Sequence, residues 1–311
     1  MLLSLFYIFI FPGFIFLSTY GLVVEYLDRK IYAHLQNRVG PPWFQPMADF
    51  IKLMGKEAIV PVRADRGMFT ILPAFALASV STAVLYIPIW NFSAIYPFKT
   101  DIVVVLYLLT IPTITFFIAG WVSTSLYATL GAIRTITQLF AYEVPLFMAL
   151  LGPALLAGSW SISGIAEFYY KNPLLSICNI PGFIVAVIAM QGKLERVPFD
   201  IPEAETEIVA GTFTEYSGRF LALFRMTIDI EMVVLVTLLG AIFLPFFFPG
   251  NVLVGIVLYL VKTTIIIFIL ALIRSLMARL RIEQMVNFCW KFLAPAAILQ
   301  ILIDLVVKGV I

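Results

Sequence analysis

Eight apolar stretches dominate this 311-residue chain, and each has a length of about 20 residues, the length an α-helix needs to cross a bilayer. They cover residues 3–25, 68–90, 102–122, 135–157, 177–194, 223–247, 251–274 and 288–308. Charged residues make up only 12% of the chain, against roughly 25% in soluble proteins. The sequence therefore predicts an all-α fold, a polytopic membrane helix bundle with about eight transmembrane helices. We expect one integral membrane domain over residues 1–311.

The distribution of basic residues predicts how this bundle sits in the membrane. Of the 20 Lys and Arg, 16 fall in segments on one side, three fall on the other side, and Lys262 lies inside a span. Loops rich in Lys and Arg stay in the cytoplasm. We therefore expect a multi-pass protein of the cell membrane with both termini outside. Its large cytoplasmic loops would cover about 28–67, 193–222 and 275–287.

The chain holds few residues that could bind a cofactor. It has one histidine, His34, and two cysteines, Cys178 and Cys289, that are far apart in sequence. Typical haem, zinc and iron–sulfur sites need more of these ligands. We expect no cofactor and no metal in this chain. The basic residues are spread over the loops, so no nucleic-acid partner is expected.

The first loop contains an amphipathic pattern. A turn-rich QNRVGPPW segment at 36–43 is followed by apolar residues at helical spacing, with Asp49 and Lys52 on the opposite stripe. This pattern predicts a helix that lies along the membrane surface or under a partner. Asp49 and Lys52 are three residues apart and are expected to pair.

The third loop is acidic. Its six carboxylates are Glu195, Asp200, Glu203, Glu205, Glu207 and Glu215. Pro198 and Pro202 prevent a regular helix at its start. We expect a helix to begin near Pro202, with Glu203, Glu207, Gly211 and Glu215 on one face and Glu205 on another. Such a cluster suits a proton relay, because coupled carboxyls titrate over a wide range. The alternative is a solvated acidic face that docks a basic partner.

Four ionisable residues inside the spans attract most interest: Glu143, Asp229, Glu231 and Lys262. A charge at the centre of a membrane helix costs roughly 2.5–3.5 kcal/mol, so such residues are functional candidates. A structural Lys262–carboxylate pair is the alternative. Arg225 precedes Asp229 by four residues and is expected to neutralise it. Glu25 and Asp304 lie near span ends and are expected to reach water.

Taken together, these motifs resemble the membrane subunit of respiratory complex I (subunit 1 or H) that joins the hydrophilic arm to the proton-pumping arm. The resemblance covers nearly the whole chain. The most specific stretch is PFDIPEAETEIVAG followed by EYSG, within Arg196–Ser217. Further matching segments are Gln36–Pro41, Gln45–Asp49, Gly131–Arg134 and Tyr142–Val144.

The resemblance implies a helical bundle at the elbow of a large complex. It implies that acidic residues carry coupling from a chamber at the loops into the membrane. On this basis the path comprises Glu143, Glu203, Glu205, Glu207, Glu215, Asp229, Glu231 and Lys262. The loop that meets the hydrophilic arm comprises Arg38, Asp49, Lys52, Arg134, Arg196 and Asp200.

Several positions depart from the complex I pattern. Lys193 stands where a Glu is usual, Glu195 and Pro42 where an Asn is usual, and Ile228 at the sixth-span Glu, with Asp229 and Glu231 beside it. The pattern is more similar to the homologous subunit of energy-converting membrane-bound [NiFe] hydrogenases and their sulfur-reducing relatives. That similarity implies a hetero-oligomeric complex with hydrophilic redox-arm subunits (hydrogenase-like large and small subunits), antiporter-like membrane subunits and lipid. The partner subunits would carry iron–sulfur clusters, with or without a NiFe centre.

Three functional hypotheses follow. In the first, the chain is the membrane anchor and coupling subunit that links ferredoxin-driven hydrogen evolution or sulfur reduction to H⁺ or Na⁺ translocation. In the second, it is the quinone-chamber subunit of an NADH or ferredoxin:quinone oxidoreductase. In the third, it is a stand-alone transporter or a purely structural anchor. It would be an enzyme only as part of a redox-driven complex. The transported ion, the terminal electron acceptor and the question of whether ions cross this chain stay open.

Overall fold

The computed structural model describes residues 2–248 and 250–310, with side chains except at positions 2, 3, 205, 206 and 310. All regular structure in this part is helical. The α-helices are α1 (Leu2–Phe9), α2 (Phe14–Leu35), α3 (Gln45–Met54), α4 (Arg66–Ala83), α5 (Asp101–Val122), α6 (Leu126–Ala157), α7 (Ile162–Lys171), α8 (Ile180–Lys193), α9 (Glu205–Ile208), α10 (Gly218–Ile242), α11 (Val252–Leu276), α12 (Ile282–Phe288) and α13 (Ala294–Val310). Short 3₁₀ segments cover Val84–Tyr86, Pro173–Asn179 and Gly211–Phe213.

The expected membrane bundle is confirmed, with seven candidate spans. The helical segments long and apolar enough to cross a membrane are Ser4–Leu35, Arg66–Tyr86, Asp101–Val122, Leu126–Ala157, Pro173–Lys193, Val252–Leu276 and Ile282–Gly309. The eighth expected span, 223–247, corresponds to α10, which has 25 residues but carries Arg225, Asp229 and Glu231. Because of these three charges, α10 is not one of the seven candidate spans.

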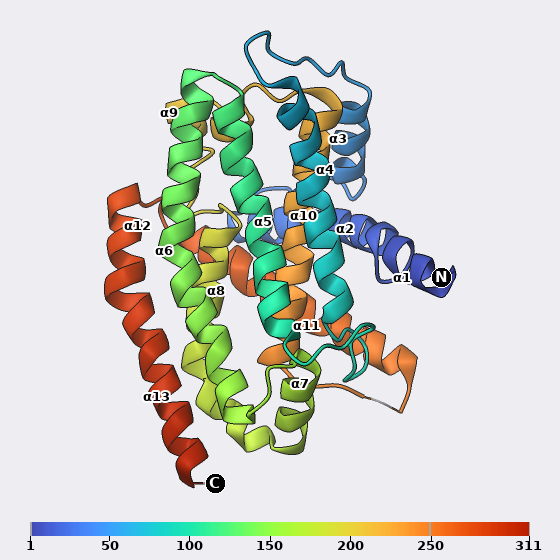
Figure 1. Cartoon of the computed structure of the whole chain (residues 1–311), viewed down its shortest axis with the longest axis vertical. Helices are drawn as coiled ribbons and strands as arrows, with labels where there is room; N and C mark the ends of the chain where they lie inside the picture. The colour runs from blue at the N-terminus through green and yellow to red at the C-terminus, as the bar shows by residue number, and fades with distance from the viewer. Residues whose placement is uncertain (1, 249, 311) are drawn as a thin grey trace.

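Helix α10 lies at the centre of the molecule. It packs against α2, α4 and α11, and every residue from 230 to 242 is buried. Figure 1 shows α10 behind α5, with α7 and the C-terminus at one end of the bundle and α3 and α9 at the other. A polar helix can occupy such a position because protein surrounds it, and lipid does not.

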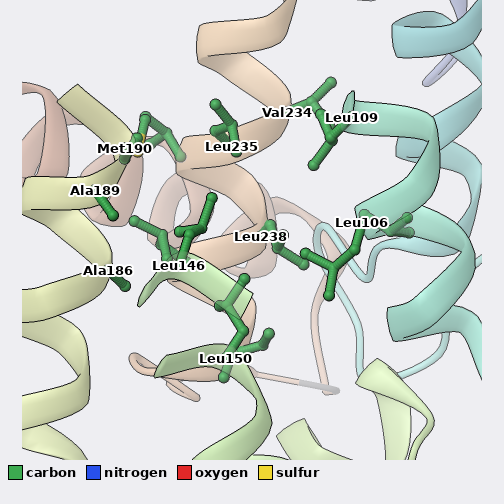
Figure 2. Close-up of a cluster of buried hydrophobic side chains, with 14 of the residues drawn as sticks. Leu106, Leu109, Leu146, Leu150, Ala186, Ala189, Met190, Val234, Leu235 and Leu238 are labelled. Carbon is green, nitrogen blue, oxygen red and sulfur yellow. The ribbon is translucent and has the colours of Figure 1, made fainter. Parts of the chain in front are cut away.

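A layer of apolar side chains fills the middle of the bundle. Figure 2 shows leucines, valine, methionine and alanines from α5, α6, α8 and α10 pointing toward one another. Leu146, Leu150, Leu235 and Leu238 are each at most 2% exposed. We call the labelled residues of Figure 2 the apolar layer. Because it holds no polar side chain, it offers water no hydrogen-bonding partner.

Two membrane segments are interrupted. The first is broken between α1 and α2, where residues 10–13 include Pro12, which cannot donate a backbone hydrogen bond. The last contains a π-helical segment, Cys289–Leu293, between α12 and α13. Each interruption changes the direction or the phase of the helix that follows it.

The amphipathic helix expected in the first loop is confirmed as α3. Its apolar residues Met47, Ile51 and Met54 are 55%, 58% and 48% exposed. On the opposite, polar stripe of α3, Asp49 lies 3.2 Å from Arg29 of α2. The helix therefore shows an apolar face outward, beside the first membrane segment.

The continuous helix expected after Pro202 is wrong. Only the four residues of α9 are α-helical there, and a 3₁₀ turn follows at Gly211–Phe213. Val209 and Gly211 have φ angles of 63° and 52°, in the left-handed region, so the chain reverses at these residues. Glu203, Glu207 and Glu215 consequently do not share one helical face.

Glycines and one amide hold this loop in the bundle. A Cβ at Gly211 would lie 1.8 Å from the Pro202 carbonyl oxygen, and a Cβ at Gly131 of α6 would lie 2.6 Å from the Thr212 nitrogen. The buried Gln138 side chain donates to the carbonyls of Gly192 and Phe199 at 2.7 and 2.9 Å. The loop is therefore part of the packed structure, and it closes one end of the bundle.

Most of the ion pairs gather at this same end, which we call the basic end. It comprises the segments 36–65, 194–217 and 277–281 together with the helix termini beside them. Lys99, Lys171 and Lys308 belong to the opposite end, where Lys308 donates to the Leu155 carbonyl at 2.7 Å. The bundle thus has one strongly charged end and one weakly charged end.

Candidate functional site

A cavity of about 230 Å³ lies at the basic end and is lined mainly by charged residues. We call it the charged pocket. Its acidic residues are Glu25, Asp28, Glu195, Asp200, Glu203, Asp229 and Glu231, and its basic residues are Arg29, Lys193, Arg196, Arg225 and Arg274. They come from α2, α8, α10, α11 and the third loop. Such a density of charge inside a membrane bundle is stable only if the charges compensate one another.

A buried ion pair lies at the floor of the pocket. Lys193 Nζ lies 2.9 Å from Glu231 Oε1, and each side chain is 2% exposed. Lys193 also donates to the Leu109 carbonyl at 2.6 Å, and its ammonium lies 5.8 Å from the centre of the Tyr142 ring. Leu109 belongs to the apolar layer labelled in Figure 2, so the hydrogen bond from Lys193 places this ion pair directly beside that layer.

One carboxylate between two arginines forms a second wall. Asp28 is 1% exposed, and its Oδ2 lies 2.7 Å from Arg196 Nη1 in an ion pair and accepts a hydrogen bond from Arg274 Nη1 at 3.0 Å. The Arg274 guanidinium also lies 4.3 Å from the Tyr32 ring centre. This cluster joins α2, α11 and the start of the third loop. It gives the wall a fixed geometry because each guanidinium has a direct partner.

Glu195 occupies the turn that ends α8. Its nitrogen bonds the Gly192 carbonyl, and the Arg196 nitrogen bonds the Gln191 carbonyl, which is the Schellman pattern. Glycine usually fills this position, but here Glu195 has a φ of 51°. Burial raises the pKa of the Glu195 carboxyl well above its usual range, and Glu203, Glu231 and Asp200 raise this pKa further. A strained backbone thus holds a carboxyl that retains its proton more readily than usual.

Other ion pairs form the rim of the pocket. Arg225 lies 3.1 Å from Glu203, and Arg29 pairs with both Glu25 and Asp49. Glu25 also contacts the carboxyl of Asp229. Two carboxyls this close can share one proton. The rim therefore connects the pocket to α3 and to the third loop.

The structure brings together only some of the site residues expected from sequence. The charged pocket includes Arg196, Asp200, Glu203, Asp229 and Glu231. Asp49 and Lys52 line a neighbouring cavity of about 270 Å³ between α2, α3 and α10, which shares Glu25, Arg29, Arg225 and Asp229 with the pocket.

Other expected residues lie outside the charged pocket. Glu143 is half-buried on α6, next to Tyr142 and within electrostatic reach of Lys193. Glu215 is half-buried near the end of the third loop, and Arg38 is exposed. The side chain of Glu205 lies outside the described residues.

Glu207 and Arg134 form a separate cluster on the surface. The Glu207 carboxylate contacts Arg134 at 2.7 Å and Arg279 at 3.3 Å. The hydrogen bond from Arg134 lowers the pKa of Glu207, and the charges of Arg279 and Arg281 act in the same direction. This carboxylate therefore pairs with arginines away from the charged pocket, and its expected role in the path stays a prediction.

Three pairings considered from the sequence are wrong. Arg225 pairs with Glu203 in place of Asp229, because the third loop lies against α10. Asp49 pairs with Arg29 in place of Lys52, because α3 packs beside α2. Glu231 pairs with Lys193 and not with Lys262, which instead lies 3.8 Å from the Phe247 ring centre.

A further correction concerns the burial of Asp304. It was expected to reach water, but it is fully buried. Gln300 Nε2 donates to Asp304 Oδ2 at 2.9 Å and to Asn179 Oδ1 at 3.0 Å. The last membrane segment packs on α6 and α8 at this level, so the carboxyl is covered.

Sequence reasoning missed Asp28 and Arg274 and treated Lys193 only as a departure from a pattern. Each lies in the part of a membrane helix that is nearest the basic end of the bundle. This position was the one feature of the sequence that could have pointed to them. Among the side chains that the structure describes, no three of His, Cys, Asp or Glu converge as a metal site. The absence of a bound cofactor stays a prediction.

Comparison with known proteins identifies the family. A family model described as NADH dehydrogenase matches residues 7–305. The chain is 34% identical to the H-type membrane subunit of the NADH-quinone oxidoreductase of Dehalococcoides mccartyi strain 195, covering 96% of this chain and 84% of the relative. It is 35% identical to the corresponding subunit of Brevibacillus brevis, covering 91% and 87%.

A solved structure agrees in fold. A chain of the archaeal membrane-bound sulfane sulfur reductase, a respiratory membrane complex, superposes with a TM-score of 0.83 at 25% identity, covering 93% of this chain and 96% of that one. With a family model spanning nearly its whole length and relatives above 30% identity, the chain belongs to the NADH dehydrogenase family of membrane proteins, which includes the H-type subunits of NADH-quinone oxidoreductases.

Proposed function

We propose that this chain is the membrane anchor and coupling subunit of a complex-I-like respiratory complex, in which redox chemistry of a hydrophilic arm drives H⁺ or Na⁺ translocation. The observation that carries the proposal is the charged pocket, with the Lys193–Glu231 pair at its floor and the apolar layer beneath. Such a pocket can respond to charge at the basic end without opening a direct path through the bundle. In this orientation the basic end faces the cytoplasm, as its Lys and Arg residues favour.

In the proposed mechanism Lys193 transmits a change of charge at the rim of the pocket toward the membrane interior. A change of charge at the rim alters the protonation of Glu195, which lies two residues after Lys193 in the chain. If the ammonium moves from Glu231 toward Glu143, Glu231 becomes a buried carboxylate without its cation. An uncompensated buried charge is costly, so proton uptake by Glu231 would accompany this movement. Two arrangements of one lysine would then couple the rim to the membrane interior.

We favour a hydrogen-evolving or sulfur-reducing partner arm over a quinone reductase. The cavity between α2, α3 and α10 is lined by seven charged residues out of twelve. An apolar quinone gains little from such walls. The similarity to a sulfane sulfur reductase subunit supports the same choice.

The quinone-chamber function is the second candidate, because the relatives at 34% and 35% identity are subunits of NADH-quinone oxidoreductases. In either case we expect iron–sulfur clusters, with or without a NiFe centre, in hydrophilic partner subunits. We expect antiporter-like subunits beside the chain in the membrane.

The test uses the complex purified with its native subunits and reconstituted into liposomes. Hydrogen evolution, polysulfide reduction and quinone reduction are assayed with reduced ferredoxin or NADH, while internal pH and ²²Na⁺ uptake are followed. We expect Glu143→Gln to abolish ion transport while the complex stays assembled and retains its redox activity. Glu167→Gln, at the opposite end of the bundle, is the matched control.

Three results would contradict the proposal. Unchanged transport in Glu143→Gln would remove this residue from the path. Reduction of quinone alone would reject the hydrogenase-type or sulfur-reducing arm and favour the second candidate. Absence of any redox activity in every purified complex would leave the chain as a transporter or an anchor.

A further inference from the structure

An apolar groove of about 590 Å³ lies on the side of the bundle, away from the charged pocket. It is formed by α8, α11, α12 and the start of the third loop. Every lining residue except Gln284 is apolar. Phe199 and Phe288 stack at its base with ring centres 6.4 Å apart. We call it the apolar groove.

The groove opens outward between two of the candidate membrane spans. Ile184 is 53% exposed on α8, and Leu276 and Met277 at the end of α11 are 74% and 51% exposed. The lining residues of α11 run from Ile269 to Leu276, which is about 10 Å along a helix axis. The groove therefore runs along the direction in which an acyl chain lies.

The basic end of the groove meets a cluster of arginines. Leu280 lines both the groove and a second cavity of about 330 Å³ that includes Arg134, Arg279, Arg281 and Glu207. We call this second cavity the arginine pocket. A hydrogen bond of 2.9 Å from the Leu280 nitrogen to the Pro198 carbonyl fixes the junction.

The arginine pocket has an excess of positive charge. Its three arginines surround one described carboxylate, Glu207, which binds Arg134 and Arg279. Arg281 is exposed and forms no ion pair with any side chain that the structure describes. The short connection 277–281 joins two candidate membrane spans, so we expect Arg279 and Arg281 at the level of lipid headgroups.

We propose that the apolar groove and the arginine pocket together bind one anionic phospholipid, with an acyl chain in the groove and the phosphate at Arg279 and Arg281. The groove alone would not select a ligand, because lipid tails are as apolar as its walls. Selection comes from the arginines, since basic pockets between membrane helices on the cytoplasmic side favour anionic headgroups. This site shares no lining residue with the charged pocket.

The experiment measures phosphatidylglycerol and phosphatidylcholine retained by the delipidated complex after titration, using native mass spectrometry. The wild type should retain phosphatidylglycerol in preference to phosphatidylcholine. Arg279→Ala with Arg281→Ala should weaken phosphatidylglycerol binding by about fivefold for each arginine, with no change for phosphatidylcholine. Arg63→Ala, an exposed loop arginine outside both cavities, is the control and should bind like the wild type.

Two further variants keep the test decisive if the double variant is unstable. Glu207→Gln removes the only described acid of the arginine pocket and should strengthen phosphatidylglycerol binding. Met277→Trp should fill the groove and lower the retention of both lipids.

Equal retention of both lipids by the wild type, or equal phosphatidylglycerol binding by the wild type and the double variant, would overturn the proposal. A cross-link from Ile184→Cys to another subunit would overturn it too, because the groove would then be a protein interface.

Discussion

At the scale of single residues, Glu195 combines a strained backbone with a buried carboxyl, and each of these lowers the stability of the folded protein. Its backbone adopts a left-handed conformation that glycine would adopt without strain, and its carboxyl is surrounded by other carboxyls. A glycine there would end α8 equally well. The side chain is therefore the reason for the strain, and we expect it to have a role in charge transfer.

The titration of Glu195 makes a prediction about pH. Its pKa in the folded protein is raised, so the folded state holds a proton that the unfolded state has already lost. Wild-type stability should therefore fall as pH rises above the unfolded pKa of about 4.3. Glu195→Gln should unfold at a higher temperature than the wild type at pH 8, and the difference should vanish near pH 4. Thermal unfolding followed by tryptophan fluorescence would check this, and a pH-independent difference would contradict it.

The Lys193–Glu231 pair makes a second prediction at this scale. Lys193→Met would leave Glu231 buried without its cation and should cost about 3–5 kcal/mol of stability. Lys193→Met combined with Glu231→Leu should recover most of that loss, because an apolar pair of similar volume replaces both charges. Denaturation of the two variants in detergent would measure this. Equal stability of the single and double variants would show that the pair is not coupled. Ion transport should be lost in both.

At the scale of elements, the membrane spans were predictable and the third loop was not. A span depends on local composition over about 20 residues, so the sequence shows it directly. In the loop, Glu203, Glu207 and Glu215 have helical spacing, but Val209 and Gly211 reverse the chain between them. The glycine was visible in the sequence, whereas the contact with Pro202 that requires it depends on the folded loop.

Gly211 should tolerate no side chain. Gly211→Ala would place a Cβ at 1.8 Å from the Pro202 carbonyl oxygen, on a backbone with a φ of 52°. The loop must then shift, and we expect a loss of more than about 2 kcal/mol. Gly309→Ala is the control, because nothing lies within 4 Å of a Cβ at that position. Thermal unfolding together with limited proteolysis of the loop would measure both, and a stable Gly211→Ala with an intact loop would contradict the packing described.

At the scale of the whole molecule, the apolar layer separates the charged pocket from the weakly charged end. Leu238→Asn would place an amide among side chains that are almost completely buried. We expect a severalfold rise in passive proton leak through proteoliposomes that contain the complex without redox substrates. Leu238→Met conserves side-chain volume, so its proton leak should equal that of the wild type. An unchanged leak in Leu238→Asn would mean that this layer is not the barrier.

The whole-molecule arrangement also explains which parts of the site could not be predicted. The Asp28–Arg274 contact joins residues 246 apart, and Lys193 meets Glu231 across two helices. A single sequence shows that these charges exist and that each needs a partner. It does not show which partner, because that depends on how α2, α8, α10 and α11 come together. Of the acidic residues expected in the path, Glu203, Asp229 and Glu231 share the charged pocket, while the pairings expected for them do not form.

The π-helical segment at Cys289–Leu293 has a consequence for the last span. It accommodates one residue more than a regular helix would, and one residue corresponds to about 100° of rotation. On α12, Gln284 and Phe288 face the apolar groove, whereas on α13 Gln300 and Asp304 meet Asn179 and Gly152. The last span therefore consists of two helices, α12 and α13, whose side-chain faces are rotated relative to one another about a common axis. Deletion of a single residue from Cys289–Leu293 would rotate one of these helices away from its packing partners while leaving the other in place.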